Sequence, residues 1–448
     1  MGITIVNKFD PSTVKNRQNI ALVLAGGAIS GGAFKLGGLL AMERFLGDRS
    51  INDFDTYVGI SAGAFLAAPL AAGVTTLELY RAILGQSQVI TPFTPLHFYW
   101  PNFEEFVTKP TRFVKDSLLF GPSMMGSLVR AGIYKRRALM RTLRKKILRR
   151  GDVSWADAIG PILSEAWEGK KTPFSLDYLP SALFDNRQIE KYIRENLDRN
   201  GLPNSLRLLK LERGVSLYIG ATNVDTAKLD VFGPDEDDSV TISQAVQAST
   251  AIPGFFRPAR LGDRDYFDGG ISRTASMSVA AAKGADLIIA YNPFRPYIPQ
   301  PSNSAEKKRL ANAGIITVLN QAVRTLLHTR LHIGVEKLRL DPSFKGDIIL
   351  VEPSPTDQDF FHMNPLNFWS RTQAVQQGYT SVKESLEAQY SLVAKVLKAH
   401  GIRPDLEALQ DTLEKITAAQ ESQEIVDVFR GDEKPDKPKG KHKLQLVS

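Results

Sequence analysis

The sequence predicts an α/β fold built on a mainly parallel sheet. A short apolar run at 19–25 leads through glycines into a helical pattern, and a second run at 54–60 leads into another helix. Similar apolar runs return at 215–221 and 285–293. A strand, a turn and a helix repeated in this way are typical of a parallel sheet with helical crossovers.

The first elements can be assigned in order along the chain. The strand at 19–25 is followed by a glycine-rich turn at 26–32 and by a helix with regular apolar spacing. The strand at 54–60 is followed by a helix of small residues, which we expect to break near Pro69 because proline lacks the backbone N–H. Residues 91–200 begin with aromatic residues and continue in helical patterns, so we expect a helical insertion there.

The rest of the chain is expected to add helices and a tail. Long proline-free stretches at 305–340 and 366–400 have regular apolar spacing, which predicts helices. The predicted regions are an N-terminal arm at 1–18, an α/β domain at 19–295 with the insertion at about 91–200, a helical region at 296–430, and a disordered basic tail at 431–448.

Composition excludes several classes of protein. The 448 residues contain no cysteine, so disulfides, thiolate catalysis and cysteine zinc sites are excluded. The N-terminal segment lacks the pattern of a signal peptide, and no apolar stretch approaches the roughly 20 residues that span a bilayer. We therefore expect a cytoplasmic protein, which can also lie on a membrane surface. The net charge of +8 suits anionic partners.

The pattern G-x-S-x-G occurs where the second strand meets its helix. Ser61 stands between Gly59 and Gly63, with an apolar strand directly before it and a helix of small residues directly after it. Glycines two residues to either side let the strand and helix approach closely while the serine hydroxyl projects from the turn. Taken alone the pattern also fits an ordinary glycine turn, but its context favours a nucleophile.

The glycine-rich turn upstream, Gly26 to Gly32, predicts a binding site for negative charge. Successive small residues expose backbone N–H groups, which can hold a phosphate or an oxyanion. The turn fits neither of the common glycine-rich nucleotide motifs, G-x-x-x-x-G-K-[ST] and G-x-G-x-x-G. An oxyanion hole is favoured because a nucleophile elbow follows on the next strand.

Asp268 is the best candidate for the base that activates the serine. It ends a short run and precedes Gly269 and Gly270, which permit a sharp turn that leaves the carboxylate at a strand end. Alone, Asp-Gly-Gly is usually only a turn. As a base, an aspartate with a pKa of about 3.9 would need direct hydrogen bonding to Ser61 and partial desolvation.

Together the three motifs resemble the patatin-like phospholipase family. The segments 221–226 and 248–253 are also similar to parts of that family, and the resemblance covers roughly 19–295. It implies a three-layer α/β/α sandwich and hydrolysis of acyl esters of phospholipids or other glycerolipids. It also implies a two-residue mechanism, with Ser61 as nucleophile, Asp268 as general base and no catalytic histidine, metal or organic cofactor.

The resemblance further implies that the glycine loop supplies the oxyanion hole. The donors would be backbone N–H groups of Gly26, Gly27, Ala28, Ile29, Ser30 and Gly31. The family loop usually reads G-G-G-x-[RK]-G, whereas here Ala28 replaces the third glycine and Ser30 or Gly31 stands where the cation belongs. Lys35 is the nearest cation, but helical geometry favours a position for it elsewhere.

Two alternative functions stay open at this stage. One is an α/β-hydrolase esterase with a Ser-Asp-His triad, because His328, His332, His362 and His400 follow Asp268 in the chain. His328 and His332 are spaced i, i+4, as in helical metal sites, but HTRLH lacks the glutamate of H-E-x-x-H, so we expect no metal. The other is a non-catalytic module that binds lipid or protein.

The segment Lys135–Arg150 predicts contact with a membrane. It holds nine basic residues, no acidic residue, and leucine and isoleucine at helical spacing. A basic amphipathic helix is typical of a membrane-surface element, although a solvated helix face fits the same pattern. No aromatic residues interleave with the basic ones, so we expect no nucleic-acid partner. The sequence leaves the oligomeric state open.

Overall fold

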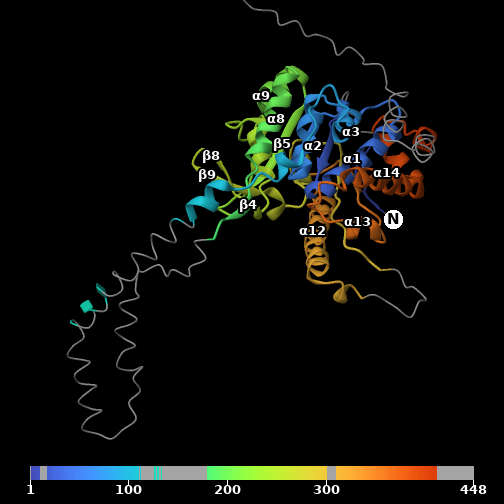
Figure 1. Cartoon of the computed structure of the whole chain (residues 1–448). Coiled ribbons are helices and arrows are strands. Elements are labelled where there is room, and N and C mark those ends of the chain that lie inside the picture. Colours follow the sequence, from blue (N-terminus) through green and yellow to red (C-terminus); the bar gives the residue numbers. More distant parts are fainter. Residues whose placement is uncertain are drawn as a thin grey trace, which may run out of the picture. The chain divides into compact units, whose positions relative to one another are not determined.

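The computed structural model describes most of the chain. The described residues are 2–10, 18–109, 179–299 and 309–410, with a few positions between 111 and 133. The chain divides into two compact units, residues 1–100 together with 186–448, and residues 101–185. The sheet and the site below belong to the first unit (Figure 1).

A nine-stranded sheet runs through the first unit in the order β1-β11-β10-β2-β3-β5-β9-β8, and β6 also pairs with β5. The pairs that join β11, β10, β2, β3 and β5 are all parallel, whereas β1, β6, β8 and β9 pair in antiparallel fashion. The predicted α/β fold with a mainly parallel sheet is confirmed. The strands are β1 (Ile3–Val6), β2 (Ile20–Leu24), β3 (Thr56–Ile60), β5 (Ser216–Asn223), β6 (Leu229–Phe232), β8 (Ala259–Leu261), β9 (Arg264–Asp268), β10 (Leu287–Tyr291) and β11 (Asp347–Val351).

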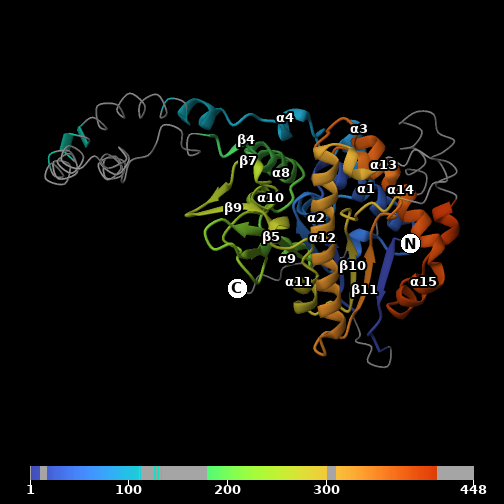
Figure 2. The ribbon, with the colours of Figure 1, turned by 90° about the horizontal axis from the view of Figure 1, so that it is seen from below.

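Helices cover both faces of the sheet. On one face, Leu331 and Val335 of α12 pack in a core with Ile288 of β10 and Ile348 of β11. On the other face, Tyr291 of β10 reaches α1 (Figure 2). The helices are α1 (Ala28–Phe45), α2 (Ala62–Ala72), α3 (Thr76–Leu84), α4 (Pro95–Phe98), α8 (Arg187–Arg199), α9 (Leu206–Arg213), α10 (Ile242–Ser249), α11 (Met277–Ala282), α12 (Ile315–Leu340), α13 (Gln358–His362), α14 (Arg371–Ala388) and α15 (Tyr390–Ala399).

Helix α14 packs directly on α1 because glycines remove the side chains between them. A Cβ atom on Gly37 would lie 1.9 Å from the carbonyl oxygen of Val375, and a Cβ atom on Gly378 would lie 1.9 Å from that of Phe34. Both distances are far below van der Waals contact, so only glycine fits at this crossing. The C-terminal helices are thus an integral part of the layer that covers the sheet.

The helical prediction for 296–430 is wrong at β11, and the predicted N-terminal arm contains β1. These two strands pair with each other, and β11 also pairs with β10. The strand at 347–351 is buried on both faces, so its sequence is an almost continuous apolar run without alternation. Periodicity alone cannot distinguish such a short run from a segment of a buried helix. The predicted break near Pro69 is also wrong, since this residue lies inside α2.

Several predictions concern parts of the chain outside the described residues. The basic segment Lys135–Arg150 and the tail at 431–448 are among them, so the membrane-surface helix stays a prediction. The same holds for most of the insertion at about 91–200. Within the described ranges, no helix is long and apolar enough to cross a bilayer.

Candidate active site

Ser61 lies on a strained turn between β3 and α2. Its backbone has φ 56° and ψ −129°, a left-handed conformation that L-residues rarely adopt. A Cβ atom on Gly59 would lie 2.5 Å from Ala64 Cα, and one on Gly63 would lie 2.1 Å from Leu24 O. The two glycines are therefore required for the close approach of strand and helix, as the G-x-S-x-G spacing predicts.

Asp268 reaches the same end of the sheet by a different route. Strand β3 pairs with β5 as far as Ile60–Gly220, and β9 pairs with the same edge of β5 from Asp268–Ala221 onward, because β6 occupies the opposite edge at both levels. The elbow serine and the aspartate therefore follow one another along one edge of β5, although they are about two hundred positions apart in the chain. Strand β5 does not separate them, so the two side chains can approach each other.

The carboxylate of Asp268 accepts a hydrogen bond of 2.7 Å from the N–H of Gly270. Burial raises the pKa of Asp268 to about 6, and the Ser61 hydroxyl, the Gly270 N–H and the charge on Lys35 oppose this rise because each stabilises the ionised carboxylate. The Ser61 hydroxyl is thus close enough to Asp268 to act on its ionisation. Gly269 is needed at the turn because a Cβ atom there would lie 2.3 Å from the carbonyl oxygen of Gly220.

Ser249, at the end of α10, fixes the backbone of the elbow. Its hydroxyl oxygen accepts a bond of 2.8 Å from the N–H of Ser61 and donates one of 2.6 Å to the carbonyl of Gly220. Two residues later, the carbonyl of Ala251 accepts a bond of 2.8 Å from the N–H of Asp268. One short segment thus holds both partners. The sequence analysis noted a family likeness at 248–253 but assigned Ser249 no role.

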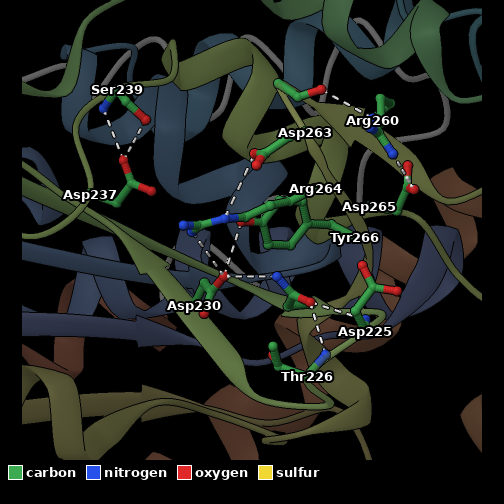
Figure 3. A network of polar contacts seen from close by, with 12 residues as sticks. Asp225, Thr226, Asp230, Asp237, Ser239, Arg260, Asp263, Arg264, Asp265 and Tyr266 are labelled. Carbon is green, nitrogen blue, oxygen red and sulfur yellow. Dashed lines mark hydrogen bonds and ion pairs between the residues drawn. The ribbon is translucent and has the colours of Figure 1, made fainter.

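A polar network fixes strand β9, which ends at Asp268 (Figure 3). The hydroxyl of Tyr266 donates to the carboxylate of Asp230 over 3.0 Å, and Arg264 lies 3.9 Å from the same oxygen. Arg260 pairs with Asp265 at 2.7 Å on the neighbouring hairpin strand. The exposed ion pairs add little stability, whereas Tyr266, which is buried, ties β9 to Asp230.

Three of the six predicted oxyanion donors are already engaged. The N–H groups of Ile29 and Ser30 donate to the carbonyl of Pro365 over 3.0 and 3.1 Å, and the N–H of Gly31 donates to the carbonyl of Gly27 over 2.9 Å. A backbone N–H that holds a good internal bond is a poor donor to an incoming oxyanion. Pro365 belongs to the C-terminal region, for which no role at the site was predicted.

The N–H groups of Gly26, Gly27 and Ala28 have no hydrogen-bond partner within the part of the chain that the structure describes. Gly26 borders the elbow, since a Cβ atom on it would lie 3.4 Å from Ser61 Cβ. Ala28 has φ 50°, so alanine keeps the left-handed backbone where the family loop has glycine. These amides are therefore the best candidate donors.

Lys35 is buried beneath the glycine loop rather than directed away from it. Its ammonium donates to the carbonyls of Ala25 and Gly26, the latter over 3.0 Å. Burial lowers the pKa of Lys35 to about 7, against the opposing effect of the negative charge of Asp268. The sequence analysis undervalued this residue, because helical periodicity alone does not show that α1 is buried on all sides.

An apolar pocket opens at Ser61. It encloses roughly 880 Å³ of empty space, including its opening to solvent. Its lining combines Ser61, the first turn of α1, and aliphatic and aromatic side chains from distant segments, among them Ile29, Leu36, Phe65, Phe93, Phe98, Ile189, Tyr192, Ile252 and Phe368. Phe93 and Phe98 come from the aromatic cluster noted in the sequence, whereas Phe368 comes from the C-terminal region.

The four histidines that could complete a triad have other partners. His400 bonds Gln18 at 2.9 Å and Asp347 at 3.0 Å, and Asp347 opens β11 at the opposite end of the sheet from Ser61. His362 bonds the carbonyl of Gln358. The remaining two, His328 and His332, lie against Glu352. The Ser61 hydroxyl instead acts on Asp268, whose ionised carboxylate it stabilises.

The chain is similar to a known protein family and to several solved structures. The family described as patatin-like phospholipase matches residues 22–281, which is more than half of the chain. Among solved structures, VipD from Legionella pneumophila is 17% identical, with 83% of this chain and 67% of that chain covered and a TM-score of 0.36. Human GIVD cytosolic phospholipase A2, solved with methyl gamma-linolenyl fluorophosphonate, is 11% identical over 86% of this chain and 60% of that one, with a TM-score of 0.33. ExoU of Pseudomonas aeruginosa, solved with SpcU, is 13% identical over 97% and 74%, with a TM-score of 0.23.

Proposed function

We propose, from the premise that this chain belongs to the patatin-like phospholipase family, that it hydrolyses acyl esters of phospholipids or other glycerolipids. In this proposal Ser61 is the nucleophile and Asp268 is the only general base. The backbone N–H groups of Gly26, Gly27 and Ala28 stabilise the oxyanion. Catalysis needs no histidine, metal or organic cofactor.

The observation that carries the proposal is the buried carboxylate of Asp268 beside Ser61, whose hydroxyl stabilises the ionised form of that carboxylate. A pKa of about 6 makes this carboxylate a stronger base than an ordinary aspartate by on the order of 10²-fold, while most of it stays ionised at neutral pH. A base with that pKa, placed beside the nucleophile, can take the hydroxyl proton without an intermediary.

The pocket supports a lipid as substrate. Its walls are almost entirely aliphatic and aromatic, and Ser61 lies in the lining beside them. An acyl chain in this pocket would bring its ester carbonyl to the hydroxyl. Burying each methylene contributes about 0.8 kcal/mol, so the pocket favours long acyl chains over short ones.

The reaction then follows in two halves. Ser61 Oγ attacks the ester carbonyl carbon while Asp268 accepts the hydroxyl proton, and the loop amides bind the negative oxygen. Collapse of this intermediate expels the alcohol, which takes the proton from Asp268. Water next gives a proton to Asp268 and attacks the acyl-serine. Collapse releases the fatty acid and returns the proton to Ser61.

Lys35 would act on the oxyanion hole as a positioning residue. In a trans peptide the C=O and the following N–H point in opposite directions. The bonds from Lys35 hold the carbonyls of Ala25 and Gly26 on the inner side of the loop. The N–H groups of Gly26 and Gly27 are thereby turned away from the lysine, toward the side where an oxyanion can bind.

Replacement of Ser61 by alanine tests the proposal. We expect Ser61→Ala to lose ester hydrolysis by a factor on the order of 10⁴ or more, to resist labelling by a fluorophosphonate, and to melt within a few degrees of wild type. Mass spectrometry of the products from mixed membrane lipids provides the readout. Ser239→Ala, an exposed serine on another loop, is the matched control and should keep wild-type activity.

Two results would overturn the proposal. Full hydrolysis by Ser61→Ala would exclude this serine as nucleophile. Absence of both labelling and hydrolysis in the wild-type protein would favour a non-catalytic binding module.

A further inference from the structure

A second cluster of reactive side chains lies beside α12, apart from the pocket. His328 and His332 are one turn apart on this helix, and Glu352 directly follows β11. Their ring and carboxylate atoms lie within 4.8 Å of one another, and none of the three residues lines the acyl pocket. Figure 2 shows α12 running beside β10 and β11, which brings the helix to the end of the sheet.

The geometry of this cluster suits a metal ion. Glu352 Oε2 lies 2.9 Å from His332 Nε2 and 3.5 Å from His328 Nε2. Ligand atoms of a tetrahedral zinc site are separated by about 3.3 Å, as follows from metal–ligand bonds of about 2.0–2.1 Å. Small rotations of the two rings would therefore bring all three atoms to ligand distance.

One ligand atom is buried and lacks a hydrogen bond. Within the described part of the chain, His328 Nε2 has no such partner, although the atom is shielded from solvent. A buried polar nitrogen left without a partner costs free energy, and such groups usually mark a functional site or a missing ion. Coordination to a metal would satisfy this nitrogen.

The surroundings of Glu352 prepare it as a ligand. Its side chain is only 2% exposed, and its other oxygen, Oε1, accepts a bond of 2.8 Å from Asn292. Its backbone N–H donates to the carbonyl of Gly2 over 2.6 Å. A carboxylate fixed in this way presents Oε2 to the histidines, as outer hydrogen bonds do in known metal sites.

The site is also accessible. The side chains of His328 and His332 are 24% and 33% exposed, so an ion can enter and a water can complete its coordination. Two imidazoles and one carboxylate with an open fourth position are the ligand set of zinc and of related first-row divalent metals. This pattern escaped the sequence analysis because the third ligand comes from a strand end and not from an H-E-x-x-H helix.

We propose that His328, His332 and Glu352 bind one divalent transition-metal ion of the Zn²⁺ type, which ties α12 to the end of β11. The ion would stabilise the layer beside the active site rather than act on the ester. A link to the site exists, since Asn292 precedes Pro293, whose ring packs against Gly27 and Gly31 of the oxyanion loop.

Metal binding by the full-length protein tests the proposal. The chain is stripped with a chelator, dialysed against Zn²⁺, and analysed for bound zinc by mass spectrometry. We expect one ion per chain in wild type, visible d–d absorption bands after Co²⁺ replacement, and a higher melting temperature with metal. His328→Ala and His332→Ala should each weaken zinc binding by at least ~100-fold and lose the cobalt bands.

His362→Ala is the matched control, because this exposed histidine lies on α13 and bonds only its own helix. It should bind zinc like wild type. Both histidines of the cluster are partly exposed, so their alanine variants are expected to fold, which circular dichroism checks. No zinc uptake by wild type, or equal uptake by wild type and both cluster variants, would overturn the proposal.

Discussion

Two buried carboxyl groups near the ends of strands in this sheet have pKa values that are shifted in opposite directions. Asp268 is 6% exposed and Glu352 is 2% exposed. Burial opposes ionisation of both groups, and it raises the pKa of Asp268 to about 6. For Glu352, contacts with His328 and His332 outweigh burial and lower the pKa to about 2.

The difference lies in the partners. Asp268 accepts a hydrogen bond from a backbone amide, and the neutral hydroxyl of Ser61 and the charge on Lys35 also stabilise its ionised form. Glu352 faces two imidazoles and the amide of Asn292. A carboxylate that is to accept a proton needs a raised pKa, so the effect of burial must exceed that of the groups that stabilise its charge. A carboxylate that is to hold a cation must stay ionised, so its partners must offset the effect of burial in full. The two environments thus suit the roles proposed for them, a general base at Asp268 and a metal ligand at Glu352.

Among the tests of this contrast between the two carboxylates, the largest effect is expected from replacing Asp268. Asp268→Asn should lower kcat/KM by a factor on the order of 10³–10⁴, because amide nitrogen and oxygen accept no proton from Ser61. Asp265→Asn, on the same strand but in an exposed ion pair, is the control and should stay within about threefold of wild type. Steady-state hydrolysis of p-nitrophenyl acyl esters measures both. A wild-type rate in Asp268→Asn would show that Asp268 is not the general base and would contradict the contrast with Glu352.

The same variant should become more stable at alkaline pH. The pKa of Asp268 is raised on folding, from 3.8 to about 6, so the ionised carboxylate destabilises the folded state above pH 6. At 1.36 kcal/mol per pKa unit, the cost is about 3 kcal/mol at most. Asp268→Asn should therefore melt above wild type at pH 8, and this gain should vanish near pH 4. A lower melting temperature at pH 8 would contradict the raised pKa.

A smaller effect is expected for Lys35→Met, which keeps the length of the side chain but removes its donors. The carbonyls of Ala25 and Gly26 would lose their partner, and the loop amides would lose their orientation. Loss of one oxyanion donor costs 10²–10³ in kcat, so we expect a fall of about 10–100-fold for an indirect contribution. Because the acyl pocket is untouched, KM should change little, and Lys35→Arg should recover less than half of the loss. A large rise in KM would show a role in binding instead.

The parts of this site that depend on local geometry could be predicted from the sequence. The elbow around Ser61 and the turn after Asp268 need glycines at fixed positions, and these are visible as patterns. Contacts made by backbone atoms are not visible in this way. Pro365 contributes only its carbonyl to the N–H groups of Ile29 and Ser30, and any residue type has a carbonyl.

Long-range pairings were likewise beyond the sequence. Strands β1 and β11 pair although they are far apart in the chain. Strand β11 was not predicted, because helical spacing surrounds it in the sequence. From the sequence, His328 and His332 were interpreted as packing residues. The carboxylate that they contact belongs to Glu352, which lies twenty positions after His332 and in a different element. Lys35 was discounted for a similar reason, since its buried position at the carbonyls of Ala25 and Gly26 depends on how α1 packs against the rest of the fold.

The smallest effect expected is the pH dependence of the wild-type enzyme, and it bears most directly on the contrast between the two carboxylates. Only ionised Asp268 accepts a proton, so kcat/KM should rise with pH and level off above a pKa of about 6. Between pH 5 and pH 7 the ionised fraction grows by about tenfold for such a group, and the rate should follow it.

A Ser-His-Asp triad would give a similar limb near pH 6.5, so the profile alone does not separate the two mechanisms. The distinction comes from repeating it in His328→Ala, His332→Ala, His362→Ala and His400→Ala. A base at Asp268 predicts the same limb in all four, whereas loss of the limb and of activity in any one of them would assign the proton to a histidine.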